Sequence, residues 1–370
     1  MTDHDSALPA NRHAADGDSD SVPSPDIRYS PERPSRQATH LGRYATATRN
    51  WVIERGIRAM TGSSASIDPA GFSDIPLISA GLRMAWLRCL RAAGIRQFVS
   101  NSGLGHPFLC HIGDLAEHPF YHRRAYQKEL ELCAAWLRQE REEAVVYDVG
   151  ANDGFFSCQL AQLLGNQPAR IYAFEPVPAT FAGLVASVQR LDLQERVYPF
   201  PAAVTDHPGP TQISYSKRNS LCSQVTPNGL NRRIGDTLAH AAGITLDEFH
   251  SFSGAFPALV KIDAEGSEQA VLRGARSLLS RPDRPALHFE YNPVTLAESG
   301  ESLEAFPELL AGYTLHYVDD LQGQTFPFGH PIGELKDIRW ICNLFAVPLG
   351  EKSESRWASA LADAQLRIAV

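Results

Sequence analysis

From residue 144 onward, short apolar runs alternate with stretches of helical periodicity, and this alternation is the feature that most constrains the fold. Buried strands are predicted at 145–149, at 170–174, within 197–204, at 258–263 and at 286–291, and helices at 158–164, 178–191 and 267–279. Residues 211–225 alternate loosely and are predicted to form an antiparallel insertion. Segments 313–318 and 341–347 are predicted to form a pair of strands that closes the fold. Strands that alternate with helices favour a parallel sheet covered by helices on both faces. The sequence therefore predicts a doubly wound, Rossmann-like α/β fold.

Composition and periodicity divide the chain into four segments. Residues 1–42 are rich in Asp, Ser, Pro, His and Ala and have almost no large apolar side chains. Such a segment cannot offset its ordering entropy by burial, so we expect it to be disordered. Apolar residues at helical spacing near 77–90 and 125–142 predict an N-terminal helical extension over 43–142. The α/β domain is expected at 143–349, and residues 350–370 form an amphipathic C-terminal tail.

Charge and cysteine usage exclude several classes of protein. The formal net charge is -8 and no basic stripe is visible, which argues against a nucleic-acid partner. The first residues are acidic, and the longest apolar-leaning run contains three arginines, so neither a secretory signal nor a membrane span is expected. The six cysteines are scattered without a Cys-x-x-Cys pair, which fits free thiols in a reducing cytoplasm. We expect a cytoplasmic protein, and nothing in the sequence indicates its oligomeric state.

A glycine-containing turn stands between the first predicted strand and the helix that follows it. Its sequence is Asp148-Val149-Gly150-Ala151-Asn152-Asp153-Gly154. Gly150 and Gly154 allow the backbone to turn tightly and to approach a ligand closely. Glu175 follows twenty-five positions after Gly150, at the end of the second strand, where an acidic residue can accept hydrogen bonds from ribose hydroxyls. This context predicts a nucleoside-binding site.

Two cofactor classes fit this outline, and the charge of the turn separates them. A dinucleotide places its pyrophosphate against a turn with three glycines and no negative charge. Here the third glycine is missing, and Asp148 and Asp153 flank the turn. S-adenosylmethionine has no phosphate, and its sulfonium and amino groups are positive, so nearby carboxylates favour it. The residues therefore favour S-adenosylmethionine over a nicotinamide or flavin dinucleotide.

Carboxylates also follow the fourth predicted strand, at the mouth of the sheet where Asp263 and Glu265 are expected to face the reacting group. Glu290, after the fifth strand, is expected nearby. A positioned carboxylate can draw the proton from a hydroxyl acceptor, so Asp263 is the predicted base, with Glu265 and Glu290 as the next candidates. Three carboxylates can also hold Mg²⁺, but we favour a metal-free site. Glu268 is interpreted as a stabilising charge in the first turn of a helix.

Three segments, in this order and spacing, resemble the FkbM family of methyltransferases. They are the turn 148–154, Ala173-Phe174-Glu175-Pro176, and Lys261-Ile262-Asp263-Ala264-Glu265-Gly266-Ser267-Glu268. The resemblance covers about residues 140–320 and implies a class I methyltransferase sheet and O-methylation of natural products and glycans. It also implies three groups of cofactor-binding residues. The methionine part of the cofactor would contact Asp148, Gly150, Asn152 and Gly154. The ribose would contact Glu175, and the adenine would contact Ala203 and Asp206.

The resulting hypothesis is an S-adenosylmethionine-dependent methyltransferase that acts on a hydroxyl of a sugar, glycan or polyketide-type small molecule. Two alternatives stay open. One is a nicotinamide-dependent oxidoreductase, which the acidic turn disfavours. The other is a relative that binds the cofactor without turnover, which the pair of carboxylates at 263 and 265 disfavours.

Overall fold

The computed structural model describes residues 77–112, 126–216, 219–226, 237–302, 305–319, 324–327 and 341–368. The segment predicted to be disordered, 1–42, and the first part of the predicted helical extension, 43–76, lie outside these ranges. The limits of the four predicted segments stay predictions.

A nine-stranded sheet forms the centre of the fold, in the order β15-β13-β12-β14-β11-β10-β3-β4-β5. Its strands are β3 (Ala144–Val149), β4 (Ala169–Phe174), β5 (Val197–Phe200), β10 (Leu259–Ile262), β11 (Ala286–Tyr291), β12 (Tyr313–Asp319), β13 (Gln324–Pro327), β14 (Cys342–Pro348) and β15 (Arg367–Ile368). Strands β5, β4, β3, β10 and β11 pair in parallel, and β14 joins β11 antiparallel. The chain reverses its strand order between β3 and β10. The predicted doubly wound, Rossmann-like sheet is confirmed.

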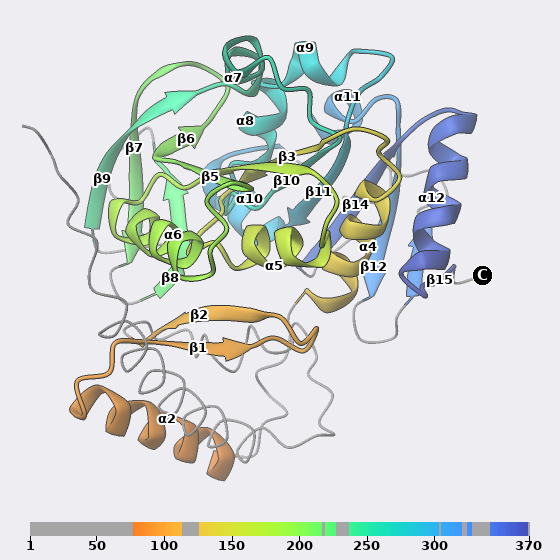
Figure 1. The fold of residues 1–370 in the computed structure, drawn as a ribbon. Coiled ribbons are helices and arrows are strands. Elements are labelled where there is room, and N and C mark those ends of the chain that lie inside the picture. Colours follow the sequence, from red (N-terminus) through yellow and green to blue (C-terminus); the bar gives the residue numbers. More distant parts are fainter. Residues whose placement is uncertain are drawn as a thin grey trace, which may run out of the picture. The chain divides into compact units, whose positions relative to one another are not determined.

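Helices cover both faces of this sheet (Figure 1). One face packs against α4 (Gln127–Leu137), α5 (Phe155–Leu163), α6 (Pro178–Arg190) and α12 (Glu351–Asp363), and the other against α7 (Leu246–Ser253), α8 (Glu268–Arg273), α9 (Arg276–Leu279), α10 (Pro293–Ser299) and α11 (Phe306–Leu309). Strand β3 shows the two-sided burial, since Val146 faces the first cluster and Val145 and Tyr147 face the second. Burial on both faces explains why the strands read as continuous apolar runs.

The segment predicted to be mostly helical also contains a hairpin. After α2 (Leu77–Ala92), strands β1 (Gln97–Asn101) and β2 (Pro107–His111) pair antiparallel. Phe108 packs edge-on against Phe155 of α5, with ring centroids 5.3 Å apart. Ser102 donates a hydrogen bond to Gln159 at 2.6 Å. Residues 102–106 form the turn of this hairpin, and its strands of five residues each are too short for a helical period to be told from a strand period.

A second, four-stranded sheet lies in the order β6-β9-β7-β8. It contains β6 (Ala202–Val204), β7 (Gly209–Ser216), β8 (Asn219–Val225) and β9 (Thr237–Ile244). The antiparallel β7–β8 pair is the insertion predicted at 211–225. The single strand expected within 197–204 is two strands separated at Pro201, because proline has no N–H for a ladder hydrogen bond.

The amphipathic C-terminal tail folds as α12 against α4. The guanidinium of Arg356 lies 4.1 Å from the ring centroid of Trp136 and also donates to the Trp136 carbonyl oxygen. Trp357 is buried against Phe345 of β14. Among the residues described here, no helix is both long enough and apolar enough to cross a membrane. The thiols of Cys89, Cys110, Cys133, Cys158 and Cys342 are free.

Candidate functional site

The turn after β3 has the backbone conformation that its glycines predict. Gly150 (φ 73°) and Gly154 (φ 87°) both lie in the left-handed region, and so does Asn152 (φ 52°), a residue type that tolerates it. A Cβ atom on Gly150 would lie 1.8 Å from the backbone oxygen of Asp263. The turn therefore approaches the end of β10 so closely that only glycine fits.

Glu175, at the end of β4, lies beside this turn. Its carboxylate accepts hydrogen bonds from the backbone N–H of Asn152 at 3.1 Å and of Val177 at 2.9 Å. Burial raises the pKa of Glu175 to about 7, although these two hydrogen bonds favour the ionised form. The side chain is therefore held in a fixed orientation and titrates close to neutral pH.

A pocket opens at the carboxyl ends of β3 and β4, next to the second sheet. It is lined by Val149, Gly150, Phe174, Glu175, Pro176, Ala202, Ala203, Val204, Ile213, Ser223, Gln224, Val225, Asp263, Ala264 and Ser267. Ligands of doubly wound sheets bind at this edge, where the strand order reverses. Of the seven predicted cofactor-binding residues, Gly150, Glu175 and Ala203 line the pocket, and so does the predicted base, Asp263.

The other predicted cofactor-binding residues lie elsewhere. Asp148 is fully buried beneath the turn, and Asn152 and Gly154 belong to the turn itself. Asp206 is not among the lining residues; it pairs with Arg273 of α8, with its carboxylate oxygen 3.0 Å from Nε. The roles assigned to these residues stay predictions, and the position of Asp206 gives no support to an adenine contact.

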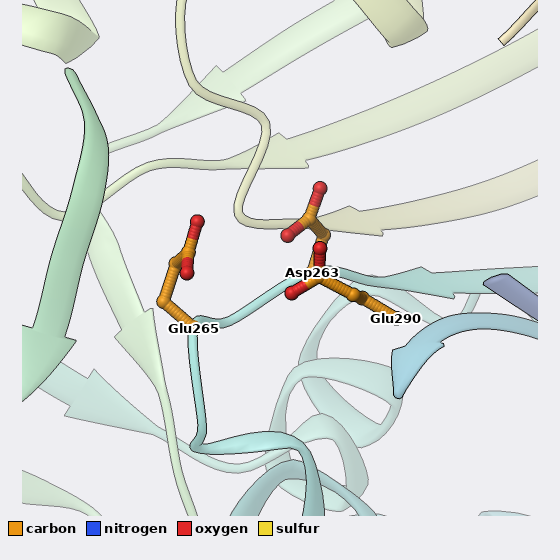
Figure 2. Close-up of side chains that lie close together, drawn as sticks. All are labelled: Asp263, Glu265 and Glu290. Carbon is orange, nitrogen blue, oxygen red and sulfur yellow. The ribbon is translucent and has the colours of Figure 1, made fainter. Parts of the chain in front are cut away.

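Three carboxylates converge at the carboxyl ends of β10 and β11, two from the segment after β10 and Glu290 from β11 itself (Figure 2). One oxygen from each of Asp263, Glu265 and Glu290 lies within 4.8 Å of the others, and all three residues are partly buried. Burial and then the neighbouring carboxylates raise the pKa of both Glu265 and Glu290 well above its ordinary value. Like charges so close together oppose full ionisation. The structure thus brings together the three carboxylates that the sequence analysis expected to lie near one another.

Glu268 has a larger role than the helix-terminal charge that the sequence suggests. It is completely buried, and its Oε1 accepts hydrogen bonds from the backbone N–H of Ala264 at 3.0 Å and of Gly266 at 3.1 Å. These bonds span Glu265, whose φ of 50° is unusual for a residue with a side chain. Glu268 therefore holds the turn that presents Glu265.

Lys261 is the functional residue that sequence reasoning missed. Its ammonium lies 3.1 Å from Asp148 Oδ1, 3.5 Å from Asp263 Oδ2 and 3.0 Å from the Gly150 carbonyl oxygen. Parallel pairing places Lys261 beside Asp148 in the register of β3 and β10. The register of β3 and β10 is the signal that could have predicted this ion pair, because residues beside each other on neighbouring strands point to the same face of a sheet.

The matches to known proteins agree with this geometry. The family model of the methyltransferase FkbM domain matches residues 148–316 of this chain. These residues contain the turn, Glu175 and the three carboxylates. Over these residues the chain is similar to the FkbM methyltransferases, as the sequence motifs indicate. The doubly wound sheet expected from the sequence is the one that the structure contains.

Two curated methyltransferases align with part of the chain. The hexuronic acid methyltransferase AglP of Haloferax volcanii is 28% identical over 157 residues, which are 42% of this chain and 60% of that protein. The 31-O-demethyl-FK506 methyltransferase FkbM of Streptomyces tacrolimicus is 30% identical over 156 residues, which are 35% of this chain and 58% of that protein. The chain thus spans about three fifths of the length of these relatives.

A solved structure of a methyltransferase FkbM from Methylobacillus flagellatus is also similar. It is 16% identical, the match covers 58% of this chain and 47% of that chain, and the TM-score is 0.36.

Proposed function

We propose that the protein is an S-adenosylmethionine-dependent methyltransferase. The observation that carries the proposal is the pocket between Gly150, Glu175 and Asp263, whose charged lining residues are carboxylates. Carboxylates repel a pyrophosphate and favour a sulfonium, and the left-handed glycine lets the backbone approach the ligand closely. Gly150 and the Asn152–Gly154 turn would hold the methionine part, and Glu175 would accept hydrogen bonds from the ribose.

The acceptor in this proposal is a hydroxyl of a sugar, a glycan or a polyketide-type molecule. The two curated relatives support this choice, because the name of one refers to a hexuronic acid and that of the other to FK506. A hydroxyl is a poor nucleophile until a base takes its proton. The carboxylate cluster supplies candidate bases beside the pocket.

Asp263 is the proposed base, because it is the carboxylate of the cluster that both lines the pocket and lies beside the ammonium of Lys261. A base in this position can reach a group bound in the pocket, because the Asp263 side chain is partly exposed to it. S-adenosylmethionine would supply the methyl group: its S–CH3 bond would break as the acceptor O–CH3 bond forms, and the cofactor would leave as the neutral thioether S-adenosylhomocysteine. Asp263 would take the proton of the acceptor hydroxyl. Burial and the neighbouring carboxylates raise the pKa of Glu265 and of Glu290, which favours their neutral form beside this base.

Isothermal titration of the full chain with S-adenosylmethionine and with NADH tests the proposal. We expect binding of S-adenosylmethionine and none of NADH; binding of NADH alone would establish the oxidoreductase alternative. Turnover of methyl-labelled cofactor against a panel of hydroxylated sugars and macrolides then separates an enzyme from a relative that only binds. Cofactor binding without transfer to any member of a broad panel would favour the non-catalytic alternative.

We further propose that the site works without a metal ion. The Lys261 ammonium already places a positive charge beside Asp263, and burial and the neighbouring carboxylates raise the pKa of Glu265 and of Glu290, which disfavours the fully ionised cluster that a divalent cation would need. Methyl transfer in buffer containing EDTA is expected to proceed at the rate seen with added Mg²⁺. A loss of activity in EDTA that only Mg²⁺ restores would show that the carboxylates need a divalent cation.

Cofactor affinity is expected to rise with pH between 6 and 8. Because the pKa of Glu175 is about 7, this carboxyl is mostly protonated at pH 6 and mostly ionised at pH 8. The ionised form accepts ribose hydrogen bonds and attracts the sulfonium, so the Kd at pH 6 should exceed that at pH 8 by about tenfold. Titration calorimetry at both pH values measures the ratio.

The variant Glu175→Gln is the control for this pH dependence. It keeps the shape of the side chain and removes the titration of this group, while Glu268, whose pKa is also about 7, is unchanged. The variant should bind S-adenosylmethionine more weakly and with little change across the pH range. An equal pH dependence in both proteins would assign the effect to Glu268 or to the cofactor itself.

A further inference from the structure

Lys261 is an unusual residue for the interior of a parallel sheet. It lies on β10 with 4% of its surface exposed, and its ammonium is 5.6 Å from the centroid of the Phe156 ring. Removing an ammonium ion from water is costly unless charged and polar partners replace the water. The partners here are Asp148, Asp263 and the carbonyl oxygen of Gly150.

These partners belong to different parts of the site. Asp148 and Gly150 belong to the strand and turn that would receive the cofactor, whereas Asp263 follows β10 on the acceptor side. Ser157 of α5 donates a hydrogen bond to Asp148 Oδ2 at 2.5 Å, and the Lys261 ammonium pairs with Oδ1, so this carboxylate is held at both oxygens. Lys261 is therefore a rigidly seated cation that joins the cofactor turn to the candidate base.

The pKa of Lys261 agrees with this description. Burial lowers the pKa of Lys261, but the Asp148 and Asp263 carboxylates outweigh burial and raise it above its ordinary value. The side chain is therefore charged at neutral pH. Its charge lies close to Asp263, and the other two carboxylates of the cluster form no ion pair with it at comparable distance among the described residues.

We propose that Lys261 is a positioning residue for methyl transfer, which locks the Gly150 carbonyl of the cofactor turn to the Asp263 carboxylate and so couples cofactor binding to the orientation of the base. The inference rests on the proposed function. Its physical content is that a change at Asp263 is transmitted to the cofactor turn through the Lys261 ammonium. Without that ammonium the two sides of the site respond independently.

A double-mutant cycle on cofactor affinity tests the coupling without a known acceptor. The probe is S-adenosylmethionine, titrated into wild type, Asp263→Asn, Lys261→Met and the double variant. In the wild-type background, Asp263→Asn is expected to raise the Kd about three- to tenfold. In the Lys261→Met background it should change the Kd by less than about twofold, because interacting residues are non-additive. Additive effects on the Kd would overturn the proposal.

Arg273→Met is the matched control for the loss of an ion-paired cation. Arg273 lies on α8 and pairs with Asp206 and Glu301, outside the pocket lining. Combined with Asp263→Asn, it should show additive effects on the Kd within about twofold. A merely structural Lys261 would behave as Arg273 does, lowering the unfolding temperature without any coupling to Asp263.

Lys261→Met leaves the buried Asp148 without its cation, and the variant can fail to fold for that reason. The cycle is then run in an Asp148→Asn/Lys261→Met background, where both partners are neutral, against Asp148→Asn alone. The expected loss of the Asp263→Asn effect is the same. If wild type binds no S-adenosylmethionine, the proposed function fails; if wild type binds and the cycle is additive, the coupling alone fails.

Discussion

Replacing Asp263 with asparagine is expected to lower kcat for a hydroxyl acceptor by about 10²–10⁴-fold, the usual contribution of a general base. Asparagine has nearly the same shape but cannot take a proton at neutral pH. Asp263 lines the pocket, and its carboxylate lies 3.5 Å from the Lys261 ammonium, so the loss concerns proton transfer more than cofactor binding. The Kd for S-adenosylmethionine should therefore change by about tenfold or less, measured by calorimetry beside the turnover assay.

Three further variants show whether the loss is specific to Asp263. Glu265→Gln and Glu290→Gln should each cost much less in kcat, because neither side chain lines the pocket and because burial, which raises the pKa of both carboxyls, favours the neutral acid that glutamine resembles. Asp283→Asn removes an exposed carboxylate that pairs with Arg281 and should leave kcat unchanged. If Glu290→Gln were the most damaging of the four, the base would have to be reassigned to β11.

The centre of the main sheet is predictable from the sequence because its parallel strands β3, β4, β10 and β11 are buried on both faces. Such strands appear as unbroken apolar runs, and the helices between them show a 3.6-residue period. The strands that escaped prediction have other surroundings. In β9, burial alternates between intermediate and exposed, and β1 and β2 are five residues each, too short for either period to be decisive. Their pairing depends on partners distant in the sequence.

The candidate site shows the same division. Residues that end neighbouring parallel strands must meet at one edge, so the proximity of Gly150, Glu175 and Asp263 follows from topology alone. The contacts of Lys261 and Asp206 depend instead on how distant segments are aligned, by strand register for Lys261 and by helix packing for Asp206. Lys261 pairs with Asp148 because β3 and β10 align in one particular register, and Asp206 meets Arg273 across 67 positions of sequence. Neither pairing leaves a local pattern in the chain.

The substitution with the largest expected effect on cofactor binding is Gly150→Ala. The new Cβ would lie 1.8 Å from the backbone oxygen of Asp263 and 2.9 Å from its carbonyl carbon, so the turn and the end of β10 would have to separate. Backbone cannot yield as a flexible side chain does, and the hydrogen bond from the Asp263 N–H to the Val149 oxygen at 3.0 Å would be strained as well. We expect a loss of about 3 kcal/mol or more in the free energy of unfolding, from overpacking together with an unfavourable left-handed alanine.

Gly94→Ala isolates the steric part of this effect. Gly94 has nearly the same φ (75° against 73° for Gly150), but no atom lies within 4 Å of the position its Cβ would take. Its alanine variant should lose only about 1–2 kcal/mol of stability, the cost of the left-handed conformation, and should bind S-adenosylmethionine as wild type does. Gly150→Ala should bind it at least about 100-fold more weakly, because moving the turn displaces the Gly150 backbone and the Asn152 N–H that orients Glu175. Urea unfolding measures the free energy of unfolding of the two variants, and calorimetry measures their Kd for S-adenosylmethionine. Equal losses of stability and affinity in the two variants would mean that the left-handed backbone alone, and not the close approach to β10, explains why glycine stands at position 150.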